Sequence, residues 1–251
     1  MMREKTVSAL AGLLDASRHA VLFTGAGMST ESGIPDYRSP GGVWDQFRPV
    51  DFSEFLASTD GQREFWRRKF ATHDMIADAE PNRGHRAVVK LMEQSRLGCI
   101  ITQNVDGLHQ KSGVPEDRVI ELHGNTTYAV CLDCATRYGL GPIRDAFLAD
   151  ESLPQCTACG GLVKTGTISF GQTMPEEPMR RAEAASRKAD LMIAVGSSLV
   201  VYPAAGFPVL AKREGCRLVI LNREPTELDP IADLVIHDEI GPLLGDLAGV
   251  N

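Results

Sequence analysis

The sequence lacks the features of several large classes of protein. No uninterrupted apolar run approaches the roughly 20 residues that a membrane-spanning helix requires, and no apolar signal core follows residues 1–5. Basic residues are not in excess: 26 against 33 acidic side chains give a formal net charge of −7, whereas non-specific nucleic-acid binding normally needs a basic face. Internal repeats and low-complexity segments are also missing. We therefore expect a cytoplasmic protein that neither enters a membrane nor binds nucleic acid directly.

Three common catalytic or cofactor-binding motifs are missing too. Gly25 and Gly27 are followed by Gly33, which comes too late for the six-residue G-x-G-x-x-G fingerprint of ordinary dinucleotide-binding folds. The G-x-S-x-G elbow of serine hydrolases is absent, and so is the H-E-x-x-H pair that binds a catalytic zinc ion. These absences argue against an ordinary Rossmann dehydrogenase, a serine hydrolase and a zinc hydrolase.

What is present is an alternation of short apolar strands and helical stretches. At 251 residues, with 43% hydrophobic and 24% charged residues, the chain can bury a substantial core. Helices are expected at residues 6–17 and 84–93. Several strands end in small polar residues, which favours an α/β fold with a doubly wound parallel sheet. The expected strands are residues 20–23, 98–102, 119–122, 191–195, 217–221 and 234–236.

Two stretches interrupt the alternation and predict a smaller domain within a single unit, 1–251. Residues 39–83 contain an aromatic and charged segment from Trp44 to His73, which is typical of two or three short helices. Residues 126–166 carry four cysteines. The larger, Rossmann-like domain would then comprise about 1–38, 84–125 and 167–251.

The stretch after the first strand carries more chemistry than a turn needs. Gly25 and Gly27 would allow a tight turn with backbone close to a bound phosphate, and Ser29 or Thr30 would open the next helix. A bare G-x-G is commonly only a turn. Here residues 34–38 add a proline, an acid, an aromatic ring and a guanidinium, which favours a ligand site.

The cysteines predict a metal site. Two C-x-x-C pairs are separated by 21 residues, and two such knuckles complete a tetrahedral four-thiolate zinc site. Four thiolates leave the metal no open position, so the zinc would be structural. The predicted ligands are Cys131, Cys134, Cys156 and Cys159. Cys99 and Cys216 lie in apolar strands and are expected to be buried.

Polar residues at two strand ends are candidates for acid–base chemistry. Gln103, Asn104 and Asp106 follow the second strand, and His123 follows the third. A histidine at such a place is more often structural than catalytic, but the amides and the carboxylate would share its pocket. The residues alone indicate a nucleotide-binding α/β protein with a zinc ribbon, and they leave the reaction open.

Together these motifs resemble those of the sirtuins, the NAD-dependent protein-lysine deacylases of the Sir2 family. The resemblance runs in order from about residue 7 to 247, and the combination of motifs is far more specific than any one of them. It is carried by the four cysteines and by residues 25–29, 32–38, 103–106, 123–124 and 196–199.

The resemblance implies that NAD binds in a cleft between the two domains. Ala26 would face the pyrophosphate, and Tyr37 and Arg38 would lie in a loop over the nicotinamide riboside. Gln103 would approach the ribose, and Asp106 would accept from the nicotinamide amide. The full set of implied NAD-binding residues is Gly25, Ala26, Gly27, Thr30, Asp36, Tyr37, Arg38, Gln103, Asn104, Val105, Asp106, Gly196, Ser197, Ser198, Asn222, Glu224 and Ile240.

The implied reaction is the family's. The carbonyl oxygen of an acyl-lysine attacks the ribose carbon that bears nicotinamide, and His123 is the general base for a ribose hydroxyl that attacks next. Asn104 is the second implied catalytic residue. The products are free lysine, nicotinamide and O-acyl-ADP-ribose, so no serine or cysteine nucleophile is needed.

The implied partners are acyl-lysine proteins, held by Ile168, Phe170 and Gly171. Ser169 and Gln172 depart from the family's usual V-x-F-G-E, and Tyr37 stands where many relatives have Phe.

The Tyr-x-x-Arg pair of desuccinylating members is absent, since the nearest counterparts are Trp66 with Lys69, or Phe65 with Arg68. We therefore expect a neutral acyl group, most simply acetyl. A longer-chain deacylase, an ADP-ribosyltransferase and a non-catalytic NAD binder are the alternatives, and His123 with its neighbours favours the deacylase.

Overall fold

The computed structural model describes residues 2–39, 41–42 and 48–251. Most of the chain is built on a six-stranded parallel sheet with the order β3-β2-β1-β7-β8-β9. Numbered by their order along the chain, these strands run 3-2-1-4-5-6, which is the doubly wound Rossmann order. They are β1 (Ala20–Thr24), β2 (Cys99–Thr102), β3 (Val119–Glu121), β7 (Leu191–Val195), β8 (Arg217–Leu221) and β9 (Leu234–Ile236).

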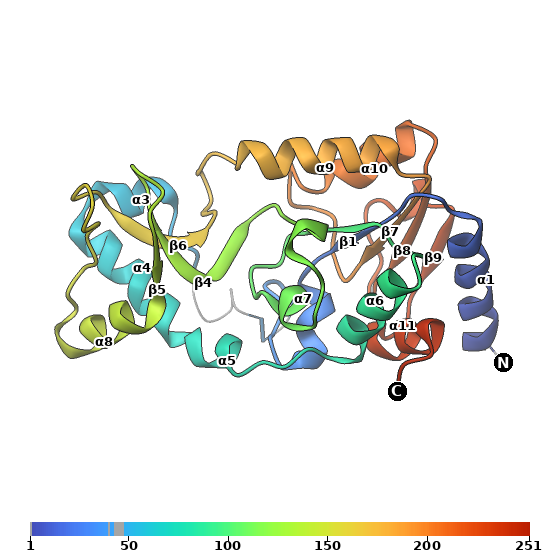
Figure 1. Ribbon diagram of the computed structural model, residues 1–251, viewed down its shortest axis with the longest axis horizontal. Coiled ribbons are helices and arrows are strands. Elements are labelled where there is room, and N and C mark those ends of the chain that lie inside the picture. The colour runs from blue at the N-terminus through green and yellow to red at the C-terminus, as the bar shows by residue number, and fades with distance from the viewer. Residues whose placement is uncertain (1, 40, 43–47) are drawn as a thin grey trace.

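Helices cover both faces of this sheet, as Figure 1 shows. One hydrophobic cluster joins α1, α6 and α11 to one face, and a second joins α9 and α10 to the other. β1 and β7 are buried along their whole length, because central strands of a parallel sheet are covered twice. The helices are α1 (Met2–Ala16), α6 (Arg83–Glu93), α7 (Leu108–Lys111), α9 (Glu176–Lys188), α10 (Gly206–Arg213) and α11 (Ile240–Ala248), with 3-10 turns η1 (Ala26–Ser32), η2 (Glu116–Arg118) and η3 (Asp229–Ile231).

A smaller part lies at one end of the molecule (Figure 1). It contains a three-stranded antiparallel sheet of order β5-β4-β6 and its own hydrophobic cluster, in which Trp66 is fully buried and stacks on Phe70 with ring centroids 5.3 Å apart. Its elements are α3 (Phe52–Ala57), α4 (Thr59–Ala71), α5 (His73–Ala77), β4 (Gly124–Cys131), β5 (Arg137–Gly139), α8 (Leu140–Asp150) and β6 (Val163–Thr167).

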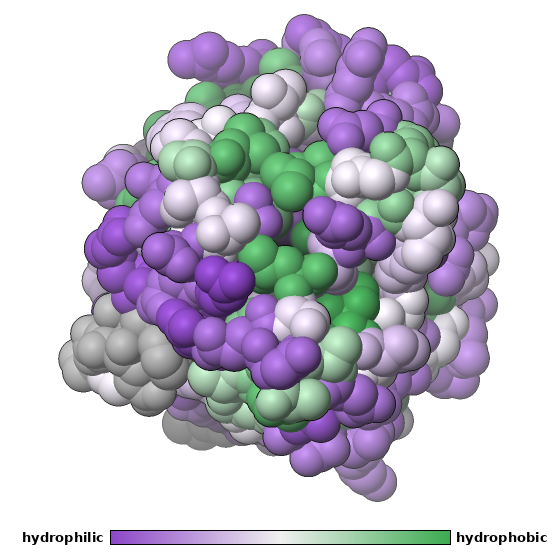
Figure 2. All heavy atoms as spheres, turned by 90° about the vertical axis from the view of Figure 1, so that its left-hand side faces the viewer, coloured by the Kyte–Doolittle hydropathy of each residue, from purple (hydrophilic) through white to green (hydrophobic). Residues whose placement is uncertain are grey.

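The outer end of this smaller part is seen in Figure 2, where apolar side chains are exposed among polar ones. Leu56 on α3 and Leu148 on α8 are 48% and 60% exposed. The small core therefore leaves apolar surface uncovered, as expected where few layers are available to bury it.

The predicted fold class is confirmed, with a local difference after β1. The six parallel strands appear within one or two residues of their predicted bounds, and the two interrupting stretches supply the helices and the small sheet. The helix after β1 was expected to open at Ser29 or Thr30, but a 3-10 turn begins directly after Gly25. Trp44 lies outside the described residues. The domain boundaries given above stay a proposal, favoured by the separate hydrophobic clusters.

Among the described residues, no helix is both long enough and apolar enough to cross a membrane.

Candidate functional site

A cavity of about 760 Å³ opens at the carboxyl ends of the parallel strands. Its wall includes the residues after β1, β2, β7 and β8, and the other side is formed by α4, α5 and the segment after β6. The strand order reverses between β1 and β7, and a doubly wound sheet binds its ligand at such a switch point. The cavity therefore lies where this fold places a nucleotide.

Three glycines allow two loops to meet at this switch point. Gly25 donates its N–H to the Val195 carbonyl at 3.0 Å, and Gly27 donates to the Gly196 carbonyl at 2.8 Å. A Cβ at Gly25 would lie 2.7 Å from the Gly196 oxygen, and one at Gly27 would lie 2.7 Å from the Gly196 Cα. Gly196 also has a φ of +61°, which side-chain-bearing residues rarely adopt. Only glycine fits at this crossing, so bare backbone faces the cavity.

Most residues predicted to bind NAD line this one cavity. Asp106 is the exception, since its carboxylate does not belong to the cavity wall. The predicted residues in the wall are Gly25, Ala26, Gly27, Thr30, Asp36, Tyr37, Arg38, Gln103, Asn104, Val105, Gly196, Ser197, Ser198, Asn222, Glu224 and Ile240, together with His123, Ile168, Phe170 and Gly171.

Asn104 is held from both ends. Its side-chain amide donates to the Gly25 carbonyl at 3.0 Å and to the Ser29 hydroxyl at 3.3 Å, while its backbone N–H donates to Thr102 Oγ1 at 3.0 Å. Asp106 supports the same turn from behind, because it accepts from Ser29 Oγ at 2.7 Å and from the Leu108 N–H at 2.8 Å. Burial raises the pKa of Asp106, although these hydrogen bonds lower it. In this structure Asp106 therefore stabilises the turn that contains Ser29.

His123 has the geometry of a neutral base. Its Nδ1 lies 3.0 Å from the Gln103 carbonyl oxygen, which can only accept, so Nδ1 carries the proton. That assignment leaves the Nε2 lone pair free to take a proton. Burial lowers the pKa of His123, while the bond to Gln103 raises it. The ring is therefore neutral at physiological pH, as a general base must be.

The loop over the cavity is braced by Asp36. Its carboxylate accepts from the Arg38 N–H at 3.0 Å, the Ser39 N–H at 2.8 Å and the Ser39 hydroxyl at 2.6 Å. Burial alone would raise the pKa of Asp36, but these hydrogen bonds bring it below its usual value. Both carboxylate oxygens are thus occupied by the loop itself, which makes Asp36 a residue that shapes the loop.

The predicted substrate segment runs along the edge of the cavity. The Ile168 N–H donates to the His123 carbonyl at 2.8 Å, and Phe170 accepts from the Phe52 N–H at 2.8 Å. Phe170 is 45% exposed, and Gln172 Oε1 accepts from the Ser169 N–H at 3.1 Å. The unusual Gln172 therefore stabilises the turn after the segment.

Sequence reasoning did not assign the side chains that α4 contributes to the wall. Phe65, Arg68 and Lys69 line the cavity, whereas Trp66 is fully buried in the small core. Burial lowers the pKa of Lys69 to about 8. Spacing on a helix shows which residues share a face, but only the packed structure shows which of them reaches the cavity.

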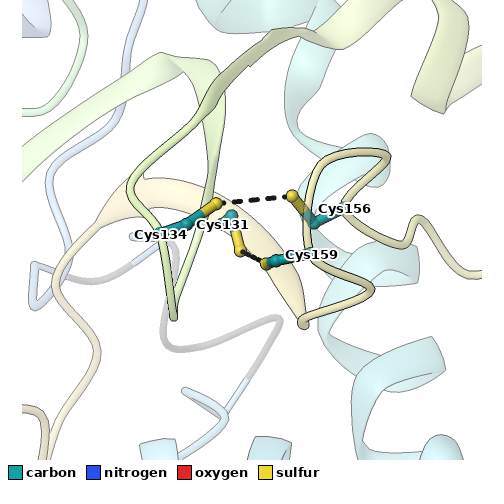
Figure 3. Close-up of side chains that lie close together, drawn as sticks. All are labelled: Cys131, Cys134, Cys156 and Cys159. Atoms are coloured by element: carbon teal, nitrogen blue, oxygen red, sulfur yellow. Dashed lines mark hydrogen bonds between the residues drawn. The ribbon is translucent and has the colours of Figure 1, made fainter.

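The four predicted metal ligands come together in the smaller part (Figure 3). Cys131 is the last residue of β4 and Cys134 lies in the turn after it, whereas Cys156 and Cys159 come from the turn before β6. Their sulfur atoms all lie within 4.8 Å of one another, with 3.5 Å between Cys131 and Cys159 and 3.5 Å between Cys134 and Cys156.

This cluster fits one structural zinc ion. Sulfurs placed tetrahedrally about 2.3 Å from zinc lie roughly 3.8 Å apart, close to the observed spacing. The Tyr138 hydroxyl donates to Cys156 Sγ at 3.0 Å and lowers the pKa of that thiol, which favours the thiolate that binds metal. Gly160, at φ +76°, completes the second knuckle.

Comparison with known proteins gives consistent results. A model of the Sir2 family matches residues 25–203. The chain is 55% identical over 243 residues to NAD-dependent protein deacetylase 1 of Bradyrhizobium diazoefficiens, covering 97% of this chain and 95% of that protein. It is 40% identical to NAD-dependent protein deacylase 2 of Pyrobaculum aerophilum, covering 94% and 92% of the two chains.

Solved structures agree with these relatives. A Sir2 structure with p53 peptide and NAD⁺ superposes with a TM-score of 0.84 and 36% identity, covering 97% of each chain. A Sir2 structure bound to a propionylated peptide gives a TM-score of 0.86 and 35% identity, covering 98% of this chain and 99% of that one. With its doubly wound sheet, its glycine crossing and its four clustered cysteines, the chain belongs to the Sir2 family.

Proposed function

We propose that this chain is an NAD-dependent deacetylase of protein lysine side chains, and that the cavity at the switch point is its active site. The observation that carries the proposal is one cavity in which Asn104, the neutral His123 and the extended segment after β6 meet the glycine crossing. Relatives named deacetylase support the reaction, and Sir2 structures with acylated peptides support the substrate class.

The chain's own residues divide the work. When bound, NAD supplies an electrophilic ribose carbon and nicotinamide as its leaving group. The backbone of Gly25 and Gly27, with Ser197, would hold the phosphates. Asn104, fixed by Gly25 and Ser29, would orient the nicotinamide riboside. His123 Nε2 would take the proton of a ribose hydroxyl.

The acyl-lysine peptide would add a strand beside Ile168–Gly171, because main-chain pairing holds an extended peptide of varied sequence.

Phe65, Met75 and Ile76 give the cavity wall apolar side chains, which supports a neutral acyl group. Lys69 lies in the same wall, where its ammonium group would attract an acidic acyl group. The test is a panel of one peptide carrying acetyl, butyryl or succinyl groups, compared between wild type and Lys69→Met. A wild-type preference for succinyl that Lys69→Met abolishes would contradict the neutral preference.

The deciding experiment is mass spectrometry of the purified protein with NAD and a peptide in acetylated and free form. Loss of the acetyl mass together with O-acetyl-ADP-ribose is expected. NAD cleavage with an intact peptide and a labelled protein would favour ADP-ribosylation instead. That reaction does not need His123 Nε2 to take a proton from a ribose hydroxyl.

His123→Ala is the first matched variant. It should lower kcat for deacetylation by about 10²- to 10⁴-fold while leaving NAD binding within a few-fold, because only proton transfer is lost. His123→Asn keeps a polar side chain of intermediate size and serves as the control. Unchanged turnover in either variant would remove His123 from the mechanism.

We also propose that the protein works in the cytoplasm with one zinc ion. All six cysteines are free thiols in the structure, and thiols and zinc–thiolate sites persist where the environment is reducing. Acyl-lysine proteins are the proposed partners. The expectation that nucleic acid is not bound directly stays a prediction.

A further inference from the structure

We propose that His109, Thr24 and Thr102 form a buried hydrogen-bonded chain that positions Asn104, and that this chain acts on the NAD step of the reaction. The inference rests on the proposed function, since Asn104 is taken to contact NAD. None of the three side chains lines the cavity, so they are positioning residues.

The chain starts at the Asn104 backbone. The Asn104 N–H donates to Thr102 Oγ1 at 3.0 Å, and the Thr24 hydroxyl donates to the same oxygen at 2.8 Å. His109 Nε2 lies 3.1 Å from Thr24 Oγ1. Because the Thr24 proton is already directed to Thr102, the His109 ring donates from Nε2 to Thr24. The chain therefore runs from the imidazole through two hydroxyls to the amide of Asn104.

Burial makes this chain costly to disturb. Thr24, Thr102 and His109 are 0%, 2% and 2% exposed. They tie the ends of β1 and β2 to α7 beneath the strand ends, and no solvent can replace a lost partner. An unpaired buried donor or acceptor costs more than the net gain from one hydrogen bond, so one arrangement of these groups is strongly favoured.

A second arm holds the other side of the Asn104 site. His85 Nδ1 accepts from the Asn82 N–H at 3.4 Å, and the Asn82 side chain donates to the Met28 carbonyl at 2.8 Å. Met28 precedes Ser29, whose hydroxyl contacts Asn104. The His85 and His109 rings meet edge to face, with centroids 5.1 Å apart. The two arms thus join at a pair of buried histidines.

The proton positions in this pair are complementary. His85 accepts at Nδ1, so its proton is on Nε2, whereas His109 has its proton on Nε2 and a lone pair on Nδ1. Those remaining atoms, His85 Nε2 and His109 Nδ1, have no hydrogen-bond partner within the described part of the chain. Two neutral rings therefore support Asn104 without bringing a charge under the NAD site.

The experiment replaces each link by a side chain of similar shape. Thr102→Val and Thr24→Val each replace a hydroxyl by a methyl group of similar size, His109→Phe replaces both ring nitrogens by a somewhat larger apolar ring, and Thr102→Ser restores the hydroxyl. Ser186→Ala is the matched control, because Ser186 is a fully buried hydroxyl on α9 without a partner among the described residues. Leu91→Ala on α6 controls for a general loss of stability.

The readouts are kcat and KM for NAD and for acetylated peptide, Tm, and amide hydrogen exchange of residues 102–106. Each Val or Phe variant should lower kcat/KM for NAD by about tenfold, leave KM for peptide within twofold, and speed exchange at residues 102–106. The Thr24→Val/His109→Phe double variant should lose no more than the larger single loss, because both remove one chain. Thr102→Ser should recover most of the activity.

Two results would overturn the proposal. One is a kcat/KM for NAD that falls only in proportion to Tm, as in Leu91→Ala. The other is additive losses in the double variant with unchanged exchange at residues 102–106. If wild type shows no NAD-dependent turnover, the proposed function fails first. The exchange measurement still tests the hydrogen-bonded chain of His109, Thr24 and Thr102, because it needs neither NAD nor peptide.

Discussion

The two parts of the molecule are stabilised in different ways. The larger part packs helices against both faces of a six-stranded sheet and buries two extensive apolar clusters. Among the described residues, the smaller part has one cluster of eight buried apolar side chains and leaves Leu148 60% exposed. It compensates with four cysteines that fit a metal ion. From this difference we expect that hydrophobic burial suffices to hold the large sheet, whereas the small sheet needs metal–thiolate bonds.

Removing the metal should have the largest effect, and it should act on the smaller part alone. Structural zinc contributes on the order of 10 kcal/mol to folding, so chelation or Cys131→Ser should unfold the smaller part while the parallel sheet persists. Fluorescence of Trp66 in a Trp44→Phe background, set against far-ultraviolet circular dichroism, measures the two parts separately. A single cooperative loss of both signals, or retention of both, would contradict the division.

The larger part should fail most readily at its glycine crossing. Gly196→Ala places a methyl group against the backbone of Gly27 and Met28 and strains a φ of +61°. We expect a loss of about 3 kcal/mol or more in the free energy of unfolding, with NAD binding lost as well. Denaturant unfolding and calorimetric titration with NAD measure these effects. Gly215→Ala, which has a φ of +90° but open space around it, is the control that separates strain from collision.

Acid should weaken the larger part through two buried histidines. Burial lowers the pKa of His85 to about 4 and of His109 to about 3, whereas unfolded histidine titrates near about 6.5. Between these pKa values the two histidines are protonated in the unfolded state and neutral in the folded state. The contribution of both rings is complete above pH of about 6.5 and is lost as the pH falls toward about 4, by roughly 3 kcal/mol per ring.

Denaturant unfolding across this pH range tests the histidine effect. His109→Phe should flatten the pH dependence, because one of the two histidines whose pKa burial lowers most strongly is gone. A slope equal to that of wild type would show that other groups govern acid stability.

The smallest effect is expected at the surface of the smaller part. Glu151 ends α8 with a φ of +58° and pairs with Arg67 of α4 at 2.6 Å, where both side chains are half exposed. Glu151→Gly relieves the backbone strain and loses the ion pair, so the two changes should offset each other to within about 1 kcal/mol. Glu151→Ala loses the pair without relieving the strain and should be the less stable of the two in thermal unfolding. Equal stability of both variants would show that the strain is negligible.

Features encoded within short segments were predictable from the sequence. The strands are continuous apolar runs, and the C-x-x-C spacing fixed the four ligands, because each knuckle is a local turn. The cavity wall followed from the resemblance of its motifs to a known family. Its local part, Gly25 and Gly27, was readable from the first strand end.

Features that depend on distant packing were not predictable. The family resemblance names Gly196, but not its contact with Gly27, which lies more than a hundred residues earlier in the chain. The His85–His109 contact joins two helices whose sequences show only apolar and polar periodicity. Asp106 is predicted to accept from the nicotinamide amide, and in the structure its carboxylate also accepts from Ser29, a partner that no spacing rule predicts.

The position of His123 constrains how the gene can change. β3 ends at Glu121 in the parallel sheet, and β4 begins at Gly124 in the antiparallel sheet, so the chain passes between the two parts within a few residues of the base. The Ile168 N–H then fixes the His123 carbonyl from the returning strand. Insertions or deletions here would shift the imidazole relative to Gln103. Length variation should therefore be excluded from residues 121–124.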